Sequence, residues 1–113
     1  MKPALLAGLT AILVSCATNR YITPEAKMEL AQCLVKEGAV MYGTDWCPVC
    51  YKEKKEFGPA WEIMQRNYVD CSEDGQKCED IPKYPFWKFR NGNVVIGYTP
   101  NFLEVLAEQS GCR

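Results

Sequence analysis

Short apolar runs separated by glycine and proline divide this chain of 113 residues into helical and extended segments. Thr23-Pro24-Glu25 is a typical helix start, because it offers an N-cap hydroxyl, a proline in the first turn and an acidic side chain. We expect this helix to continue until Gly38 stops it. Residues 39–42 then predict a short buried strand, and residues 51–57 predict a helix that Gly58-Pro59 breaks.

The second half of the chain predicts one more helical piece, three strands and a final helix. These segments are a helical piece at 60–64, strands at 68–71, 86–90 and 94–98, and a helix that runs through Ser110. Asn91-Gly92 predicts a type I′ turn between the last two strands. We expect Thr99-Pro100 to cap the last helix, which turns Leu103, Leu106 and Ala107 inward.

This order of segments predicts an α/β domain over residues 23–113. A strand–helix–strand unit followed by a hairpin and a helix gives a mixed four-stranded sheet, covered on both faces and flanked by helices. The chain has no internal repeat and no long linker that would indicate a second domain. The arrangement is that of a thioredoxin-like fold.

Cys47 and Cys50 lie where the first strand gives way to the second helix, in the stretch Trp46-Cys47-Pro48-Val49-Cys50. Thiols at positions i and i+3 are typical of a dithiol–disulfide redox site, since they lie on one face of a helix. The free N–H groups and partial positive charge of a helix N-terminus stabilise a thiolate, which lowers the pKa of the first thiol. We therefore predict that Cys47 is the exposed nucleophile and Cys50 the resolving thiol.

Three other uses of this pair fit the sequence less well. A c-type haem needs a His directly after the second Cys, but Tyr51 stands there and the chain has no His. A zinc site would have to add Cys71 and Cys78, whose spacing is wider than that of a zinc knuckle. A structural disulfide over so short a spacing would constrain the unfolded chain little. We expect no metal and no cofactor.

Residues 1–15 have the features of a bacterial lipoprotein signal peptide. Residues 3–14 are almost wholly apolar but too short for a membrane span, which takes about 20 residues. The run ends in Leu13-Val14-Ser15-Cys16, which resembles a lipobox, so we expect the leader to be removed and Cys16 to carry the lipid. Residues 16–22 would then form a short tether. An ordinary secretory signal and an uncleaved anchor are the alternatives.

The charge of the chain gives no sign of a nucleic-acid partner. Its formal net charge is −1, and positive and negative side chains are interspersed. Lys52, Lys54 and Lys55 alternate with Glu53 and Glu56, a pattern that predicts a solvated helix face with a slight positive field near the thiols.

Seven cysteines are many for a chain of this size in a reducing compartment, and they indicate an oxidising one. Six remain when Cys16 is assigned to lipid, and the sequence alone does not fix their pairing. Locality favours a bond between Cys71 and Cys78. Cys33 and Cys112 then form either a third pair or two free thiols, and Cys33 also fits a small buried apolar position.

Five short stretches of the sequence resemble a known family. They are Val40-Met41-Tyr42-Gly43, Trp46-Cys47-Pro48, Phe57-Gly58, Val69-Asp70-Cys71 and Tyr84-Pro85-Phe86-Trp87. Together they resemble the thioredoxin-like domain associated with bacterial vitamin K epoxide reductase homologues, over about residues 30 to 111. In that family the domain exchanges disulfides between the membrane reductase and secreted client proteins. The resemblance also implies a disulfide between Cys71 and Cys78.

The resemblance implies that Trp46, Pro48, Tyr84 and Pro85 contact the client. Thioredoxin-like folds place a cis-proline beside the two cysteines, and the residue before it presents its backbone to an incoming peptide. Pro85 fits this position better than Pro82, because it directly precedes a predicted strand.

The chain departs from the family pattern at three positions. Val49 stands where relatives commonly have His, Met41 where thioredoxin has a buried Asp, and Phe86 where close relatives have Thr. These differences change the surroundings of the Cys47 thiolate and of the client groove, so they bear on the reduction potential.

The sequence therefore predicts an extracytoplasmic, membrane-anchored thiol–disulfide oxidoreductase of the bacterial cell envelope or periplasm. Its expected partners are client proteins with thiols or disulfides, a quinone-linked membrane oxidoreductase that resembles vitamin K epoxide reductase, and the lipid bilayer through Cys16. The direction, oxidation or reduction, is open. The alternatives are a metal-binding lipoprotein and a structural lipoprotein whose disulfides do not turn over.

Overall fold

The computed structural model describes residues 20–113, which form four α-helices, four strands and short 3₁₀ turns. The elements are the helices α1 (Pro24–Lys36), α2 (Pro48–Phe57), α3 (Trp61–Met64) and α4 (Phe102–Ser110), the strands β1 (Val40–Gly43), β2 (Tyr68–Asp70), β3 (Phe86–Lys88) and β4 (Val94–Ile96), and the short 3₁₀ turns η2 (Gly58–Ala60), η3 (Gln65–Asn67) and η4 (Gly75–Cys78). No helix within these residues is long and apolar enough to cross a membrane. The predicted leader over 1–15 and the predicted lipid site Cys16 lie outside the described residues.

Helix α1 begins as the sequence predicts. Thr23 is its N-cap, Pro24 occupies the first helical position, and Thr23 Oγ1 accepts a hydrogen bond of 3.1 Å from the backbone N of Ala26. The helix ends at Lys36, and Gly38 follows with a φ of +79°, which glycine adopts without strain.

The four strands form one mixed sheet in the order β2-β1-β3-β4. Strand β1 is parallel to β2 and antiparallel to β3, and β3 is antiparallel to β4. Helices α2 and α3 connect the parallel pair, and a tight turn connects β3 to β4. This is the α/β arrangement of a thioredoxin-like fold, so the predicted fold class is confirmed.

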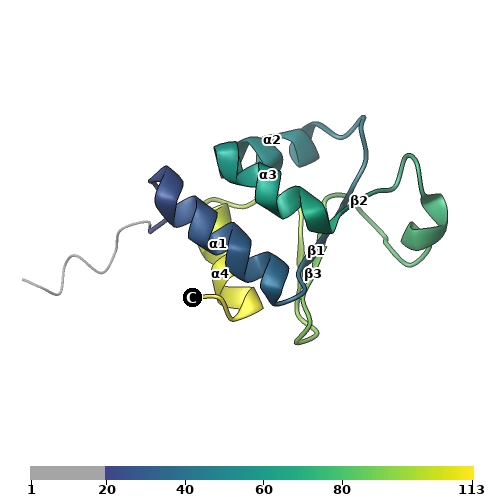
Figure 1. Ribbon diagram of the computed structural model, residues 1–113. Helices are drawn as coiled ribbons and strands as arrows, with labels where there is room; N and C mark the ends of the chain where they lie inside the picture. The colour runs from purple at the N-terminus through teal and green to yellow at the C-terminus, as the bar shows by residue number, and fades with distance from the viewer. Residues whose placement is uncertain (1–19) are drawn as a thin grey trace, which may run out of the picture.

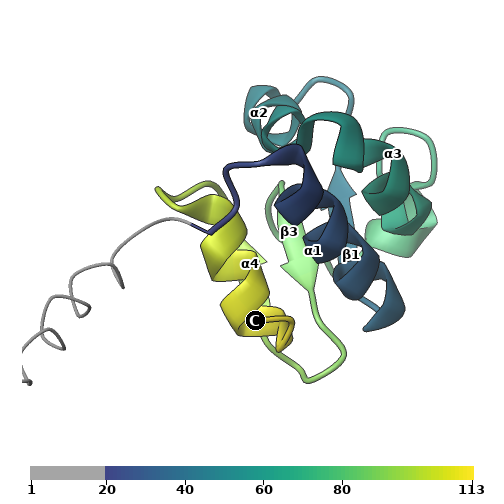
Figure 2. The same ribbon diagram turned by 60° about the vertical axis from the view of Figure 1, so that its left-hand side comes forward.

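One face of the sheet carries the main core. Met41 pairs with Tyr68 on β2 and with Trp87 on β3, and Trp87 pairs with Val95 on β4. Residues paired across a sheet point to the same face, so these side chains form one row. The four α-helices lie on this face (Figure 1), with α1 in front of β1 and β3 in Figure 2. Met41 and Trp87 are fully buried beneath them.

The opposite face of the sheet is covered by the segment between β2 and β3. Tyr42, Val69 and Phe86 form the corresponding row on this face, and Cys78 and Ile81 pack against it. Figure 1 shows this segment, with η4, on the side of the sheet away from the α-helices. Both faces are thus covered, one by helices and the other mainly by an irregular segment.

The turn between β3 and β4 is not the predicted type I′ turn. That turn needs a positive φ at both central residues, but Asn91 has a negative φ and Gly92 has one of +95°. The backbone N of Gly92 donates to Phe89 O, and that of Phe89 donates to Asn93 O, which makes a three-residue loop with glycine in the left-handed position. The Asn91 side chain donates from Nδ2 to Gln109 O in α4, at 2.9 Å.

The start of α4 also differs from the prediction. Thr99 and Pro100 precede the helix without capping it, and Thr99 Oγ1 donates to Pro100 O. The N-cap is Asn101, which has a φ of +60° and makes no capping hydrogen bond through its side chain. Gly111 ends the helix as predicted, and the buried residues include the predicted inward set, Leu103, Leu106 and Ala107.

Candidate active site

Cys47 and Cys50 lie at the start of α2 and form a disulfide. Cys47 is the N-cap of the helix, and its Sγ accepts a hydrogen bond of 3.0 Å from the backbone N of Cys50. Pro48 occupies the first helical position, where its missing N–H leaves no bond unmade. The N–H of Cys50 would also stabilise a thiolate on Cys47 after the disulfide opens, because charged acceptors make the stronger hydrogen bonds.

The loop that carries Cys47 is tied to the segment that follows β2. The backbone N of Asp45 donates to Ser72 Oγ, and Ser72 Oγ donates to Asp45 Oδ1, both at 3.0 Å. These two bonds connect the β1–α2 loop to the residue after Cys71, which fixes where the first turn of α2 begins.

The expectation that Cys47 is an exposed nucleophile needs correction. Cys47 is only 7% exposed, and Cys50 is fully buried. The neighbouring Trp46 is 70% exposed, and its ring meets that of Tyr84 edge-on with 6.3 Å between centroids. As the N-cap, the Cys47 sulfur is bonded to the Cys50 N–H at the start of the helix, and little of the residue reaches the surface.

A hollow of about 450 Å³ opens beside Cys47. It is lined by Trp46, Cys47, Pro48, Val49, Lys83, Tyr84, Ile96 and Gly97. The peptide bond between Tyr84 and Pro85 is cis, and Pro85 O accepts a hydrogen bond of 3.0 Å from the backbone N of Gly97. Of the residues predicted to contact a client, Trp46, Pro48 and Tyr84 therefore line the hollow, whereas Pro85 lies buried behind it.

Gly43 makes room for the buried side of the disulfide. A Cβ atom on Gly43 would lie 3.0 Å from Cys50 Sγ and 3.0 Å from the hydroxyl oxygen of Tyr68, which is closer than most Cβ contacts in proteins. A larger residue at Gly43 would therefore require the Cys50 sulfur or the Tyr68 side chain to shift. The Tyr68 hydroxyl and Thr44 Oγ1 are both buried without a hydrogen-bond partner among the described residues.

Glu53 is a functional candidate that the sequence analysis missed. The alternating charges of α2 predict a solvated face, but the Glu53 side chain is fully buried. Its Oε1 accepts a hydrogen bond of 2.9 Å from Trp87 Nε1, and its Oε2 has no partner within residues 20–113. The sequence feature that indicates its burial is its position three residues after Cys50 and four before Phe57. All three residues lie on one face of the helix, and all three are buried.

Burial raises the pKa of the Glu53 carboxyl to about 8. The hydrogen bond from Trp87 opposes this rise, and the negative charge of Glu56 adds to it. The carboxyl is therefore mostly protonated at neutral pH. A neutral acid thus lies in the core, on the same helix face as the buried cysteine of the pair.

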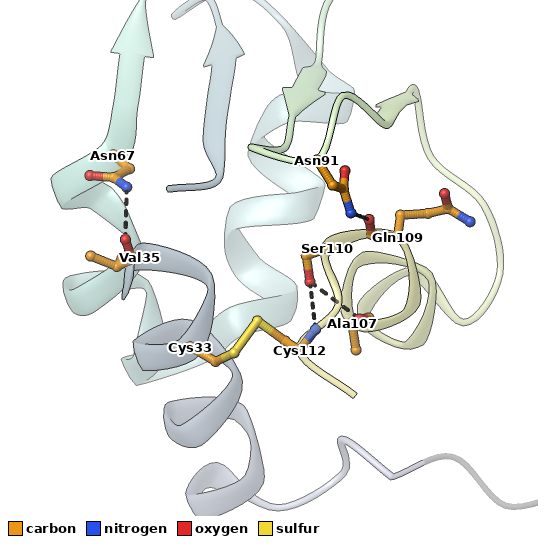
Figure 3. Close-up of a disulfide and its surroundings, with 8 residues drawn as sticks. All are labelled: Cys33, Val35, Asn67, Asn91, Ala107, Gln109, Ser110 and Cys112. Carbon is orange, nitrogen blue, oxygen red and sulfur yellow. Dashed lines mark hydrogen bonds between the residues drawn. A yellow bond between two sulfur atoms is a disulfide. The ribbon is translucent and has the colours of Figure 1, made fainter. Parts of the chain in front are cut away.

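Two further disulfides lie away from this hollow. Cys71 and Cys78 are joined across the turn η4, with 5.8 Å between their Cα atoms. Cys33 and Cys112, whose pairing the sequence leaves open, are joined between α1 and the residue after Gly111 (Figure 3). The backbone N of Cys112 donates to Ala107 O at 3.0 Å and to Ser110 Oγ at 3.2 Å, so the end of the chain is fixed at this disulfide.

Within residues 20–113, no three His, Cys, Asp or Glu side chains come together as a metal site would require.

The fold and this site define a class of protein, a thioredoxin-like α/β domain with a Cys pair at the start of its second helix. No family model matches the chain. The chain is similar to thiol-disulfide oxidoreductase LTO1 of Arabidopsis thaliana, with 37% identity over 92 residues. The match covers 73% of this chain and 23% of that relative, so the chain spans just under a quarter of the relative's length. This similarity supports a thiol-disulfide oxidoreductase-like domain.

Proposed function

We propose that this protein is a thiol–disulfide oxidoreductase whose redox-active pair is Cys47 and Cys50. The observation that carries the proposal is the position of Cys47, whose sulfur accepts the Cys50 N–H at a helix N-terminus and borders an open hollow. A sulfur held in this way leaves readily as a thiolate and attacks readily as one. The name of the Arabidopsis relative, a thiol-disulfide oxidoreductase, agrees with this chemistry.

In the oxidising direction, a client thiolate attacks Cys47 Sγ and forms a mixed disulfide. The bond between Cys47 and Cys50 breaks, and its electron pair leaves on Cys50 Sγ. A second client thiolate then attacks the client sulfur of the mixed disulfide, so the client gains a disulfide and the protein holds two reduced cysteines. In the reducing direction the Cys47 thiolate attacks a client disulfide and Cys50 resolves the product.

The surface around the hollow fits an extended client segment with apolar side chains. Trp46, Val49 and Ile96 line it and are 70%, 38% and 46% exposed, more than isolated core residues would be. Exposed apolar side chains gathered at one site are typical of an interaction surface. We therefore assign client binding to Trp46, Pro48 and Tyr84, with Pro85 holding the Tyr84 backbone in place.

We further propose that the protein acts outside the cytoplasm on a lipid anchor at Cys16 and is reoxidised by a quinone-linked membrane oxidoreductase similar to vitamin K epoxide reductase. The supporting observations are the apolar leader that ends at Cys16 and the three disulfides within residues 20–113, which suit an oxidising compartment. Mass spectrometry of the mature protein tests the anchor, since an unmodified Cys16 would exclude it.

Trapping experiments test the redox assignment. We expect Cys50→Ser to accumulate client proteins in mixed disulfides with Cys47, and Cys47→Ser to form none and to lose disulfide exchange. Cys71→Ser is the matched control, because it also leaves one unpaired cysteine, Cys78, but away from the hollow. Equal adducts in the Cys71 and Cys50 variants, or full exchange activity without Cys47, would contradict the proposal.

A further inference from the structure

The hydroxyl of Tyr68 is a buried hydrogen-bond donor that has no acceptor among residues 20–113. Most buried polar groups in folded proteins have a partner, and leaving one unpaired costs folding free energy. Tyr68 opens strand β2, and its ring packs against the core beneath the helices. An unpaired donor is explained if another state of the protein supplies the acceptor.

Cys50 is the group that can become this acceptor. The Tyr68 hydroxyl oxygen and Cys50 Sγ each lie 3.0 Å from the point that a Cβ on Gly43 would occupy. The two atoms therefore share one small space beside the end of β1. The sulfur of a closed disulfide is a weak acceptor, whereas a thiolate is a strong one.

The Tyr68 ring is held in place from two sides. The ring of Trp61 meets it edge-on with 5.5 Å between centroids, and Lys54 Nζ lies 3.9 Å from its centroid. Burial raises the pKa of the Tyr68 hydroxyl to about 12, and the negative charges of Asp70 and Asp45 add to the rise. The hydroxyl therefore keeps its proton at neutral pH and remains a donor.

We propose that Tyr68 donates a hydrogen bond to the Cys50 sulfur when the disulfide opens, and thereby stabilises the reduced protein. The inference rests on the proposed function and names a residue that tunes it. When a client thiolate attacks Cys47, the electron pair of the broken bond goes to Cys50 Sγ, and the proton of Tyr68 stays on its oxygen. The freed Cys50 side chain can rotate toward the hydroxyl, which the closed disulfide prevents.

Tyr68→Phe tests this contact, because it removes only the hydroxyl. Without the hydrogen bond the reduced form loses stabilisation, so we expect the equilibrium constant for oxidation by glutathione to rise about tenfold, a fall in potential of about 30 mV. We also expect a small thiol to reduce the disulfide more slowly, because the leaving sulfur is less stabilised. The oxidised protein should unfold at the same denaturant concentration as the wild type or a higher one, since it loses no hydrogen bond.

Tyr42→Phe is the matched control. Tyr42 is also a strand tyrosine, but it lies on the opposite face of the sheet, where its ring meets Phe86 edge-on. We expect its removal of a hydroxyl to leave the equilibrium constant unchanged.

The outcomes separate this inference from the proposed function. A pair that glutathione reduces, with the same equilibrium constant or a lower one in Tyr68→Phe, would overturn the role of Tyr68 alone. A Cys47–Cys50 pair that resists reduction in the folded wild type would overturn the proposed function and this inference with it. An equal loss of stability in the oxidised and reduced Tyr68→Phe proteins would show a purely structural role and would also overturn it.

Discussion

The disulfide Cys47–Cys50 joins residues three positions apart within one helical turn, whereas Cys33–Cys112 joins residues 79 positions apart. A redox-active disulfide would be expected to be the more exposed of the two. Here the short-range pair is buried, and the long-range pair is only half-buried. Their surroundings differ more. Cys50 shares its space with the unpaired hydroxyl of Tyr68, while the backbone of Cys112 is hydrogen-bonded within the end of the chain.

This difference shows how one fold contains both a bond that can open and a bond that holds. A disulfide stabilises mainly by restricting the unfolded chain, and the restriction grows with the length of the loop that it closes. On this account, opening the short-range pair costs the fold less stability than opening either of the other two disulfides. Opening the long-range pair removes the covalent restriction from most of the unfolded chain, so it costs the fold more stability.

The largest effect on stability is expected when Cys33 and Cys112 are both changed to Ala. Chain entropy alone predicts a loss of about 4.5 kcal/mol for a loop of this length, and about 2.5 kcal/mol for the loop closed by Cys71 and Cys78. Guanidinium unfolding of the two double variants, with Cys47–Cys50 kept oxidised, measures both losses.

The same two variants test the division of roles. We expect the glutathione equilibrium constant of Cys47–Cys50 to stay the same in both. Equal losses of stability in the two variants would contradict the dependence on loop length. A shifted equilibrium constant when Cys33 and Cys112 are absent would contradict the separation of the stabilising bond from the redox pair.

A second effect on stability concerns Glu53 and its dependence on pH. In the unfolded chain its carboxyl ionises near the ordinary pKa of 4.5, but in the folded protein the pKa is raised to about 8. Between these values unfolding releases a proton, so a rising pH favours the unfolded chain. The contribution of Glu53 is thus complete below pH 4.5 and is lost as the pH rises through 8.

Glu53→Gln tests this dependence, because glutamine keeps an oxygen acceptor for Trp87 and does not ionise. We expect the fall in unfolding free energy between about pH 4.5 and pH 8 to become shallower in this variant. Glu62→Gln, on an exposed position of α3, is the control and should follow the wild type. The same slope in all three proteins would show that Glu53 does not stay neutral in the fold.

The smallest expected effect is at Val49, which lines the hollow beside Cys47. A protonated His at this position would stabilise the Cys47 thiolate and so favour the reduced form. We expect Val49→His to raise the reduction potential by roughly 30 mV, which corresponds to about 1.4 kcal/mol. Val94→His, on an exposed position of β4, is the control in the same glutathione titration. A potential that is unchanged or lower in Val49→His would show that other groups set it.

The sequence predicts the order of elements well, because each depends on local signals. The N-cap Thr23, the glycines that end helices, and the alternation along the strands act over a few residues. The type I′ turn was predicted wrongly because tertiary contact decides it: the Asn91 side chain donates to the end of α4, and its backbone keeps a negative φ.

The sequence predicts those features of the site that depend on the spacing of residues along the chain. It does not predict those that depend on which side chains the fold buries. The spacing of Cys47 and Cys50 identifies the pair, but the low exposure of Cys47 depends on neighbours that the chain brings from elsewhere. Glu53 and Tyr68 looked ordinary in the sequence, since one lies in a charged helix and the other in a short strand. Their polar atoms are buried only once the chain folds and brings Trp87 of β3 to Glu53 and Gly43 of β1 to Tyr68.

The bond between Cys33 and Cys112 turns most of the chain into a covalent ring. The segment that covers the second face of the sheet, which stands out from the body in Figure 1, lies within that ring. A protease that cuts one peptide bond there would open the ring without releasing a fragment, and the two parts would still be folded against each other. Such a nicked molecule should migrate as one species on a gel until a reductant is added. The same bond that stabilises the fold would thus preserve the molecule after damage.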